Sequence, residues 1–400
     1  MPSDQSAGDS MASGLLNTTN VSDPVEMVKC NQSANITENC TMEKVFVQGI
    51  SHGPIAILVP ILFGIIFIVG VIGNGTVIFT VARNKVMRNV PNILIVSLSL
   101  GDLLLILVSV PFSATIYTLK SWPYGETICK FNFYMQTMSL GVSVFTLIAL
   151  SADRYMAIVD PMSKITGKTI GKAMTVVGVI WASSFLLAIP DWIFSSTSDF
   201  RMEDGNYGYM CTPYPLALYP AYPKTQGLIR FVVFFAIPVV TIGFFYLMMA
   251  YILIQSGQSM PCEGSKSAMN QQRQIAARKK VAKVVLSFVF IFLICWLPRH
   301  IYILWFFYDE YGEYNDFWYG FQIFGFCLTF VNSCVNPLAL YFLSSQFRKF
   351  YNKYLFCCIP TVRVYNPLEP TSTMHNFNST VRRASSTTNT MVHSMSQSMC

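Results

Sequence analysis

The sequence carries little charge for its length. Of its 400 residues, 12% are Asp, Glu, Lys or Arg and 53% are hydrophobic, whereas soluble domains average about 25% charged residues. This balance excludes an ordinary soluble domain and indicates a membrane protein. Histidine is also scarce, with four in the chain. Only His300 lies in an apolar run, and no nucleophile, base and orienting group can be assembled around it, so we expect neither an enzyme nor a cofactor.

What the chain has in quantity is long apolar runs. A helix of about 20 apolar residues crosses a bilayer, and seven runs reach this length. Helices are expected rather than a barrel, because several runs contain Pro or Gly, which membrane helices tolerate. The predicted fold is therefore an all-α membrane protein with a seven-transmembrane helical bundle over residues 53–343. The runs cover residues 54–82, 91–118, 127–150, 171–194, 226–254, 281–307 and 317–343.

Positively charged side chains at the ends of the runs predict how the bundle lies in the membrane. Lys and Arg gather after the first run and between the fifth and sixth, so these loops are expected to face the cytoplasm. The tail at residues 1–52 is then extracellular, and the net charge of +7, mostly cytoplasmic, requires no nucleic acid. We expect a plasma-membrane protein with a cytoplasmic C-terminus. The tail contains glycosylation sequons at Asn17, Asn20, Asn31, Asn35 and Asn39.

Two pairs of cysteines have different expected fates because they lie on opposite sides of the membrane. Cys129, at the outer start of the third run, and Cys211, before the fifth, both lie on the oxidising side and can form a disulfide. Cys357 and Cys358 follow the seventh run on the cytoplasmic side. There S-palmitoylation is one expectation, and two unmodified thiols are the alternative.

Polar side chains inside the apolar runs indicate a buried site. Asp102, Ser143, Asn332 and Asn336 each lie near the middle of a run, where a buried polar group needs a partner. One interpretation is hydrogen bonding between helices. The other is a site for a monovalent cation, here sodium, or for a proton, because a desolvated carboxylate must bind a counter-charge or become protonated.

Short motifs in a fixed order carry a family resemblance. They are Gly73-Asn74, Leu98-Ser-Leu-Gly-Asp102, Trp122-Pro-Tyr-Gly125, Asp153-Arg154-Tyr155, Trp181, Pro238, Cys295-Trp296-Leu297-Pro298 and Asn336-Pro337. With these motifs the chain resembles the rhodopsin-like G-protein-coupled receptors over residues 50 to 358. Within that class the stretches "WLPRH", "NSCVNPLALY" and "SADRYMAIVDP" are similar to the bombesin-receptor group, and most similar to insect CCHamide neuropeptide receptors.

The resemblance implies a receptor for an amidated neuropeptide, CCHamide-like or bombesin-like, that activates a heterotrimeric G protein. Coupling to Gq and calcium follows by analogy only. The matching family pair also supports the Cys129–Cys211 disulfide. In the family the arginine of the Asp-Arg-Tyr motif is held in the resting state and released to meet the G protein. The residues assigned to activation and coupling are Asp153, Arg154, Tyr155, Trp296, Pro298, Asn336 and Pro337.

One motif departs from the usual family form. Asn-Pro-x-x-Tyr would place a tyrosine at position 340, but the chain has Leu340 and then Tyr341. A shift of one residue turns the ring by about 100° around a helix with 3.6 residues per turn. The bombesin-like group shares this form, so it supports the subgroup and argues against transferring a switch role to Tyr341.

A short amphipathic helix is predicted at residues 344–358, lying on membrane lipid. Its apolar face has helical spacing and consists of Phe347, Phe350, Tyr351, Tyr354 and Leu355. Residues 359–400 are rich in Ser, Thr and Asn without apolar periodicity, so we expect a disordered cytoplasmic tail. The family implies receptor kinases and arrestin as partners of its hydroxyls near Ser385, with a plain solvated linker as the alternative.

Two ligand classes are not expected to bind, because the sequence lacks a residue that each of them requires. Retinal needs a lysine in the seventh run, and residues 315–343 contain none; amine receptors need an acid in the outer third run, and residues 131–152 contain none. The pocket expected instead is neutral to basic, with an acidic loop at 309–316 above it, which suits the carbonyl oxygens of an amidated peptide end. The predicted ligand-binding residues are Gln136, Arg230, Trp296, Arg299, His300 and Phe326.

Alternatives stay open at three points. Arg230 could extend outward to the membrane interface instead of facing a ligand. The ligand could be a different neuropeptide, although Phe326, where the bombesin group commonly has arginine, favours a CCHamide-like peptide over bombesin. From another class, a small ion-coupled transporter could use Asp102 as its ion-binding residue, but the internal repeats that are common in transporters are not found.

Overall fold

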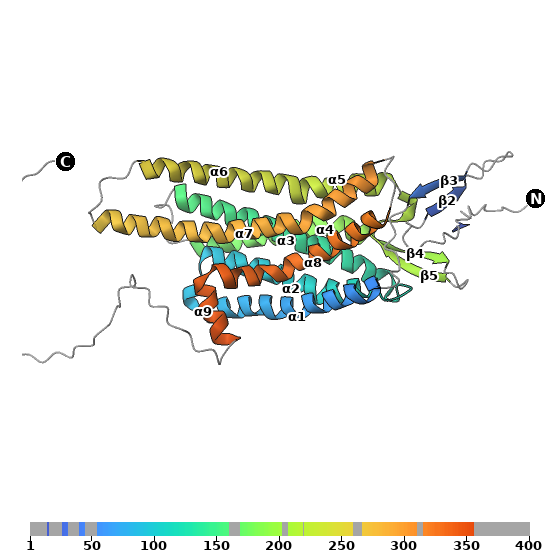
Figure 1. Ribbon diagram of the computed structural model, residues 1–400, viewed down its shortest axis with the longest axis horizontal. Coiled ribbons are helices and arrows are strands. Elements are labelled where there is room, and N and C mark those ends of the chain that lie inside the picture. Colours follow the sequence, from blue (N-terminus) through green and yellow to red (C-terminus); the bar gives the residue numbers. More distant parts are fainter. Residues whose placement is uncertain are drawn as a thin grey trace, which may run out of the picture. The chain divides into compact units, whose positions relative to one another are not determined.

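The computed structural model describes a helical bundle together with two small sheets (Figure 1). The described residues are 14–15, 26–30, 40–44, 54–159, 169–201, 207–218, 220–258, 266–309 and 315–355. Three short strands near the N-terminus, β1 (Gly14–Leu15), β2 (Glu26–Cys30) and β3 (Cys40–Lys44), pair in antiparallel fashion. The predicted glycosylation sites, Cys357, Cys358 and the tail from residue 359 lie outside these ranges.

Seven helical spans within the described bundle are long and apolar enough to cross a membrane, which confirms the predicted fold class. The fifth span is interrupted by one π-helical turn, Val232–Ala236, just before Pro238. The helices are α1 (Pro54–Arg83), α2 (Val90–Thr115), α3 (Gly125–Val159), α4 (Thr169–Phe194), α5 (Ala221–Phe231) continued by α6 (Ile237–Gln258), α7 (Lys266–Tyr308) and α8 (Asp316–Leu343).

Two helices extend well beyond their predicted apolar runs at one of their ends. The predicted third span ended at residue 150, but α3 continues to Val159. The predicted sixth span began at residue 281, but α7 begins at Lys266. The added segments are rich in Ala, Met, Gln, Lys and Arg, which favour helix without being apolar. Hydropathy therefore marks where the membrane ends and not where a helix ends.

The helices pack around α3, which contacts α2, α4, α6 and α7. Close approach is possible where small residues face a neighbour. A Cβ added to Gly141 would come within 2.8 Å of Ser184 Oγ on α4. Only glycine therefore lets α3 and α4 lie this close, with Val142 and Leu150 of α3 fully buried in the core beside them.

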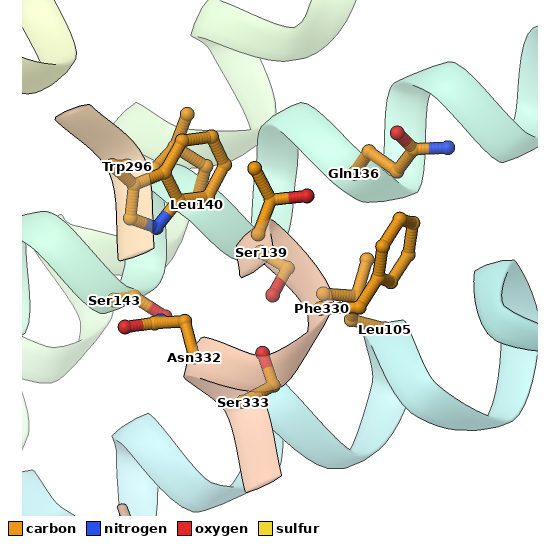
Figure 2. A pocket seen from close by; sticks show the side chains of 10 residues that line it. Leu105, Gln136, Ser139, Leu140, Ser143, Trp296, Phe330, Asn332 and Ser333 are labelled. Carbon is orange, nitrogen blue, oxygen red and sulfur yellow. The ribbon is translucent and has the colours of Figure 1, made fainter. Parts of the chain in front are cut away.

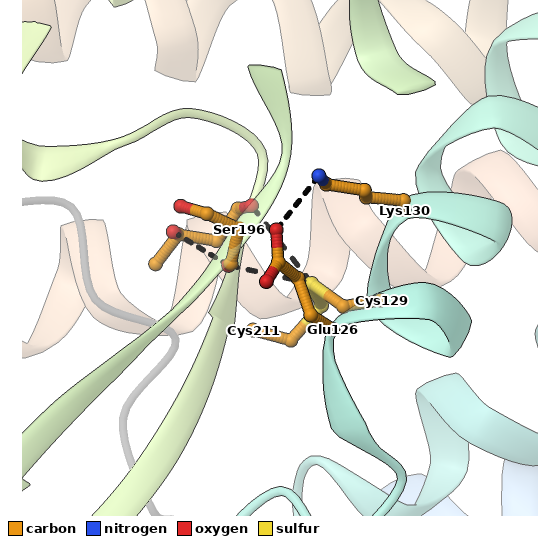
Figure 3. Close-up of polar contacts among 6 residues, drawn as sticks. Glu126, Cys129, Lys130, Ser196 and Cys211 are labelled. Atoms are coloured by element: carbon orange, nitrogen blue, oxygen red, sulfur yellow. Dashed lines mark hydrogen bonds and ion pairs between the residues drawn. A yellow bond between two sulfur atoms is a disulfide. The ribbon is translucent and has the colours of Figure 1, made fainter. Parts of the chain in front are cut away.

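A β-hairpin covers the outer end of α3. It consists of β4 (Ser196–Arg201) and β5 (Tyr207–Thr212). A disulfide joins Cys129 to Cys211, with 5.6 Å between their Cα atoms, as Figure 3 shows. Tyr209 adds two hydrogen bonds to the loop after α2, since its carbonyl accepts from Trp122 N at 2.7 Å and its N–H donates to Ser121 Oγ at 2.8 Å. The predicted disulfide is confirmed.

The short helix α9 (Ser345–Tyr354) follows the seventh span, as predicted. Ser344 caps it, since its Oγ accepts from Phe347 N at 3.4 Å. Phe347 and Tyr351 are buried, whereas Lys353 is exposed. The helix therefore has the two faces that the spacing of its apolar residues predicts.

Because the disulfide closes a loop of 82 residues, its loss is expected to reduce stability by about 2–4 kcal/mol. Cys129→Ser, Cys211→Ser and the double variant should each lower the surface level of the protein, and the double variant should be no worse than either single one. Flow cytometry of an N-terminal epitope tag measures this level. Cys327→Ser, a change at a buried free cysteine, is the control. Wild-type levels in both single variants would contradict the prediction.

Candidate functional site

A polar cluster lies at the centre of the bundle around Asp102 of α2. The Asp102 side chain is fully buried. Asn336 of α8 donates through Nδ2 to Oδ2 of Asp102 at 2.9 Å, and Ser143 of α3 donates to Oδ1 at 3.3 Å. Ser333 of α8 is a further hydrogen-bond partner of this carboxylate. Three helices therefore converge on one acid, and Ser333 is a member that the sequence-based site did not include.

A small cavity lies beside this cluster (Figure 2). The residues that line it include Ser143, Asn332, Ser333, Trp296 and Gln136. The space open to the centre of a water molecule is about 20 Å³, and one water needs about 10–15 Å³ by this measure. The cavity can hold one water or a small cation, but it is far too small for the end of a peptide.

The indole N–H of Trp296 is buried and has no hydrogen-bond partner among the residues that the structure describes. Because an unpartnered buried donor is costly, a water in the adjoining cavity would be stabilised there. Asn332 lies in the wall of the same cavity, and Ser143 connects that wall to Asp102. The structure thus brings together all four residues predicted for the cation site, Asp102, Ser143, Asn332 and Asn336, either in the cluster or in the cavity beside it.

Arg299 and Phe326, which were both predicted to contact a ligand, contact each other. The guanidinium carbon of Arg299 lies 5.8 Å from the ring centroid of Phe326, within the range of a cation–π interaction. Phe326 is buried and packs against Phe63, Tyr117 and Phe330. Phe326 therefore joins Arg299 to this group of aromatic rings.

His300 belongs to an aromatic cluster in the wall between α5 and α7. Its side chain is buried, with ring centroids 5.0 Å from Phe235, 5.6 Å from Phe231 and 6.1 Å from Trp296. His300 is therefore part of the aromatic packing in this structure, and its contact with a ligand stays a prediction.

Arg230 of α5 is bound to an acidic residue that was not predicted from the sequence. Its guanidinium forms an ion pair with Asp191 of α4. Gln226 Nε2 donates to the same carboxylate oxygen at 3.0 Å. The side chain of Asp191 is 2% exposed and that of Arg230 is 29% exposed. Arg230 therefore points between the helices, and the alternative in which it extends to the membrane interface does not describe this structure.

The Asp-Arg-Tyr motif lies inside α3 and not at its end, which corrects the predicted boundary. Arg154 forms an ion pair with its neighbour Asp153, and the two side chains are 9% and 10% exposed. Tyr155 packs against Phe245 of α6, with ring centroids 5.5 Å apart. Because α3 continues to Val159, the charges are enclosed by the bundle. The arginine is thus held by a partner of its own motif.

The shifted tyrosine of the seventh span turns as the helical geometry predicts. Leu340 is 1% exposed and belongs to the bundle core. Tyr341 contacts the ring of Tyr351 on α9, with centroids 5.9 Å apart. The residue at the usual position of the family tyrosine is therefore an apolar core residue, and Tyr341 joins α8 to the surface helix.

The match to a family model decides the class of the protein. Residues 73–341 match the model described as 7 transmembrane receptor (rhodopsin family). The chain belongs to this family. It is a plasma-membrane receptor and not an enzyme, and the resemblance seen in its motifs is confirmed.

Two curated relatives are similar to the receptor over most of its length. It is 42% identical to the neuropeptide CCHamide-1 receptor of Drosophila melanogaster over 338 residues, which cover 83% of this chain and 66% of that one. It is 41% identical to a bombesin receptor of Bombina orientalis over 308 residues, which cover 75% and 76%. The receptor thus spans just under two thirds of the fly relative.

Replacing the strongest donor to Asp102 should destabilise the receptor. Asn336→Leu leaves a fully buried carboxylate without its 2.9 Å bond, and hydrogen bonds to charged groups contribute about 1.5–3 kcal/mol. The thermal unfolding midpoint of the detergent-solubilised receptor, followed by cysteine accessibility, should fall. Ser143→Ala, which removes the 3.3 Å bond, should lower it less. Equal midpoints for wild type and Asn336→Leu would show that the cluster does not stabilise the bundle.

Proposed function

We propose that this receptor binds an amidated neuropeptide at its outer half and activates a heterotrimeric G protein at its inner face. The observation that carries the proposal is the similarity, at 42% and 41% identity, to two receptors whose names specify CCHamide-1 and bombesin. The seventh span lacks the lysine of a retinal protein, and residues 131–152 of the third span contain no acid that could pair with an amine. A CCHamide-like peptide is the ligand we favour.

Arg299 is the residue we assign to the buried end of the peptide. It lies one residue after Pro298, in the outer half of α7, and Phe326 supports it. A guanidinium presents five donors in a fixed arrangement, which suits peptide carbonyl oxygens. Gln136 on α3 is a neutral partner. Arg230 can contribute only those N–H donors of its guanidinium that are not bound to Asp191. In the acidic loop above the site, the side chains of Asp309 and Asp316 are exposed. These acids favour a peptide with some positive charge.

The Asp102 cluster is the proposed sodium site of the resting receptor. A carboxylate with hydroxyl and amide oxygens nearby is a set of hard donors that suits a small cation. The space beside Ser143 and Asn332 is of the right size for one ion or water. Allostery requires a ligand to prefer one of two states. Bound sodium would add a positive charge that stabilises the buried carboxylate in the state that contains the cluster.

The inner face carries the proposed coupling machinery. Release of Arg154 from Asp153 would free a buried cation for the G protein, with Trp296, Pro298, Asn336 and Pro337 forming the path between the two ends. We further propose coupling through Gq and calcium, phosphorylation of the tail by receptor kinases, and arrestin binding. Glycosylation of the N-terminal asparagines and palmitoylation of Cys357 and Cys358 complete the proposal.

Loss of the Arg299 guanidinium should weaken the response to the amidated fly CCHamide-1 peptide. A hydrogen bond to a charged group contributes about 1.5–3 kcal/mol, so Arg299→Gln should raise the half-maximal concentration about tenfold to a hundredfold. Arg299→Lys keeps the charge but loses the planar arrangement of donors, so it should recover part of the loss. The measurement is a calcium dose-response, normalised to surface level.

Lys120→Gln, which removes an exposed outer cation, is the matched control for this series and should behave like the wild type. Wild-type potency in Arg299→Gln would show that the arginine is structural. A wild-type receptor without any calcium response to the peptide would contradict the proposed ligand or coupling, and direct binding of labelled peptide separates these two outcomes.

Sodium should lower agonist affinity in the wild-type receptor, because the ion stabilises the resting state. Asp102→Asn removes the charge that holds the ion, so agonist affinity in this variant should become insensitive to sodium. Competition binding in sodium chloride, with potassium chloride at equal ionic strength as control, measures the effect. A full wild-type sodium dependence in Asp102→Asn would mean that the ion binds elsewhere.

A further inference from the structure

The ion pair between Asp191 of α4 and Arg230 of α5 includes one of the residues that we assign to the peptide contact. Asp191 is almost completely buried and has two donors, Arg230 and Gln226. Taking a carboxylate out of water is costly unless it is paired, so its pairing is a stable feature of the bundle. Arg230 is more exposed than Asp191, since 29% of its side chain is exposed against 2% for the acid.

The pair determines the electrostatics of the proposed binding site. Arg230 interacts electrostatically with both Arg299 and His300, so a change in its net charge is felt at the peptide contact. Asp191, which is paired with Arg230, offsets part of the positive charge of that guanidinium. The charge that a peptide end meets beside Arg299 therefore depends on the balance between Arg230 and Asp191.

We propose that Asp191 is a specificity-determining residue, which makes the site accept an uncharged carboxamide and disfavour a carboxylate at the buried end of the peptide. The proposal rests on the proposed function. A carboxamide oxygen can accept a hydrogen bond from the exposed part of Arg230 and leave the ion pair intact. A carboxylate would compete with Asp191 for the same guanidinium, and the two negative charges would repel each other.

The test compares two forms of one probe, the fly CCHamide-1 peptide with an amidated C-terminus and with a free carboxylate. The quantity measured is the ratio of their half-maximal concentrations in a calcium assay, free acid over amide, at matched surface levels. The wild-type ratio should be at least about tenfold, and Asp191→Asn should reduce it by about tenfold. Such a change corresponds to 1.4 kcal/mol, a modest interaction for charges a few ångströms apart.

Three further variants separate charge from other effects. Asp199→Asn makes the same change at an exposed residue of β4 and should leave the ratio within about twofold of wild type. Gln226→Ala removes a hydrogen bond to Asp191 but no charge, so its ratio should also stay within about twofold. The double variant Asp191→Asn with Arg230→Gln keeps the net charge of the site, and its ratio should return toward the wild-type value even if both potencies fall.

A ratio in Asp191→Asn that equals the wild-type ratio, in cells where both peptides still act, overturns the proposal and leaves the proposed function in place. So does a double variant that behaves like Asp191→Asn alone. If Asp191→Asn does not reach the surface, the double variant and Arg230→Gln test the proposal instead. Arg230→Gln removes the positive charge of the pair rather than the negative one, so it should increase the ratio. A wild-type receptor that responds to neither form contradicts the proposed function itself, and with it this proposal.

Discussion

A carboxylate that is removed from water must be hydrogen-bonded or paired, and this requirement acts at three depths of the bundle. Asp191 near the outer end joins α4 to α5, Asp102 at the centre joins α2 to α3 and α8, and Asp153 near the inner end holds the arginine next to it. Each acid fixes side chains that have a proposed role in binding or activation. The positions of the helices and the chemistry of the sites therefore have the same physical origin.

The remaining packing holds these pairs in place with mostly apolar contacts. The rings around Phe326 support Arg299, and those around His300 close the wall between α5 and α7. The disulfide attaches the hairpin to the start of α3, and the hydrogen bonds of Tyr209 attach it to the loop after α2. The outer half is therefore preorganised around a basic group, whereas the central cavity has space for no more than a water or an ion.

The sequence predicts those features that depend on local composition or on motif order. The seven spans, the Cys129–Cys211 bridge and the short helix after the seventh span are of this kind. The pairing of Asp191 with Arg230 could not be predicted, because it depends on how two helices are rotated and how far each is shifted along its axis. The inner ends of α3 and α7 were misplaced because a polar helix continues where hydropathy falls. The contact between Phe326 and Arg299 was also not predicted, because a sequence position does not show which neighbour a ring meets.

The length of α7 has a mechanical consequence. This helix is continuous from Lys266 to Tyr308, with Pro298 inside it and Arg299 directly after. At 1.5 Å per residue the part before Pro298 is about 48 Å long. A tilt of about 5° at the proline would therefore displace the inner tip by about 4 Å. The part of α7 after Pro298 is short and the part before it is long. A small tilt at the proline therefore moves the far end of the long part, where a cytoplasmic partner would bind, much more than it moves the short part.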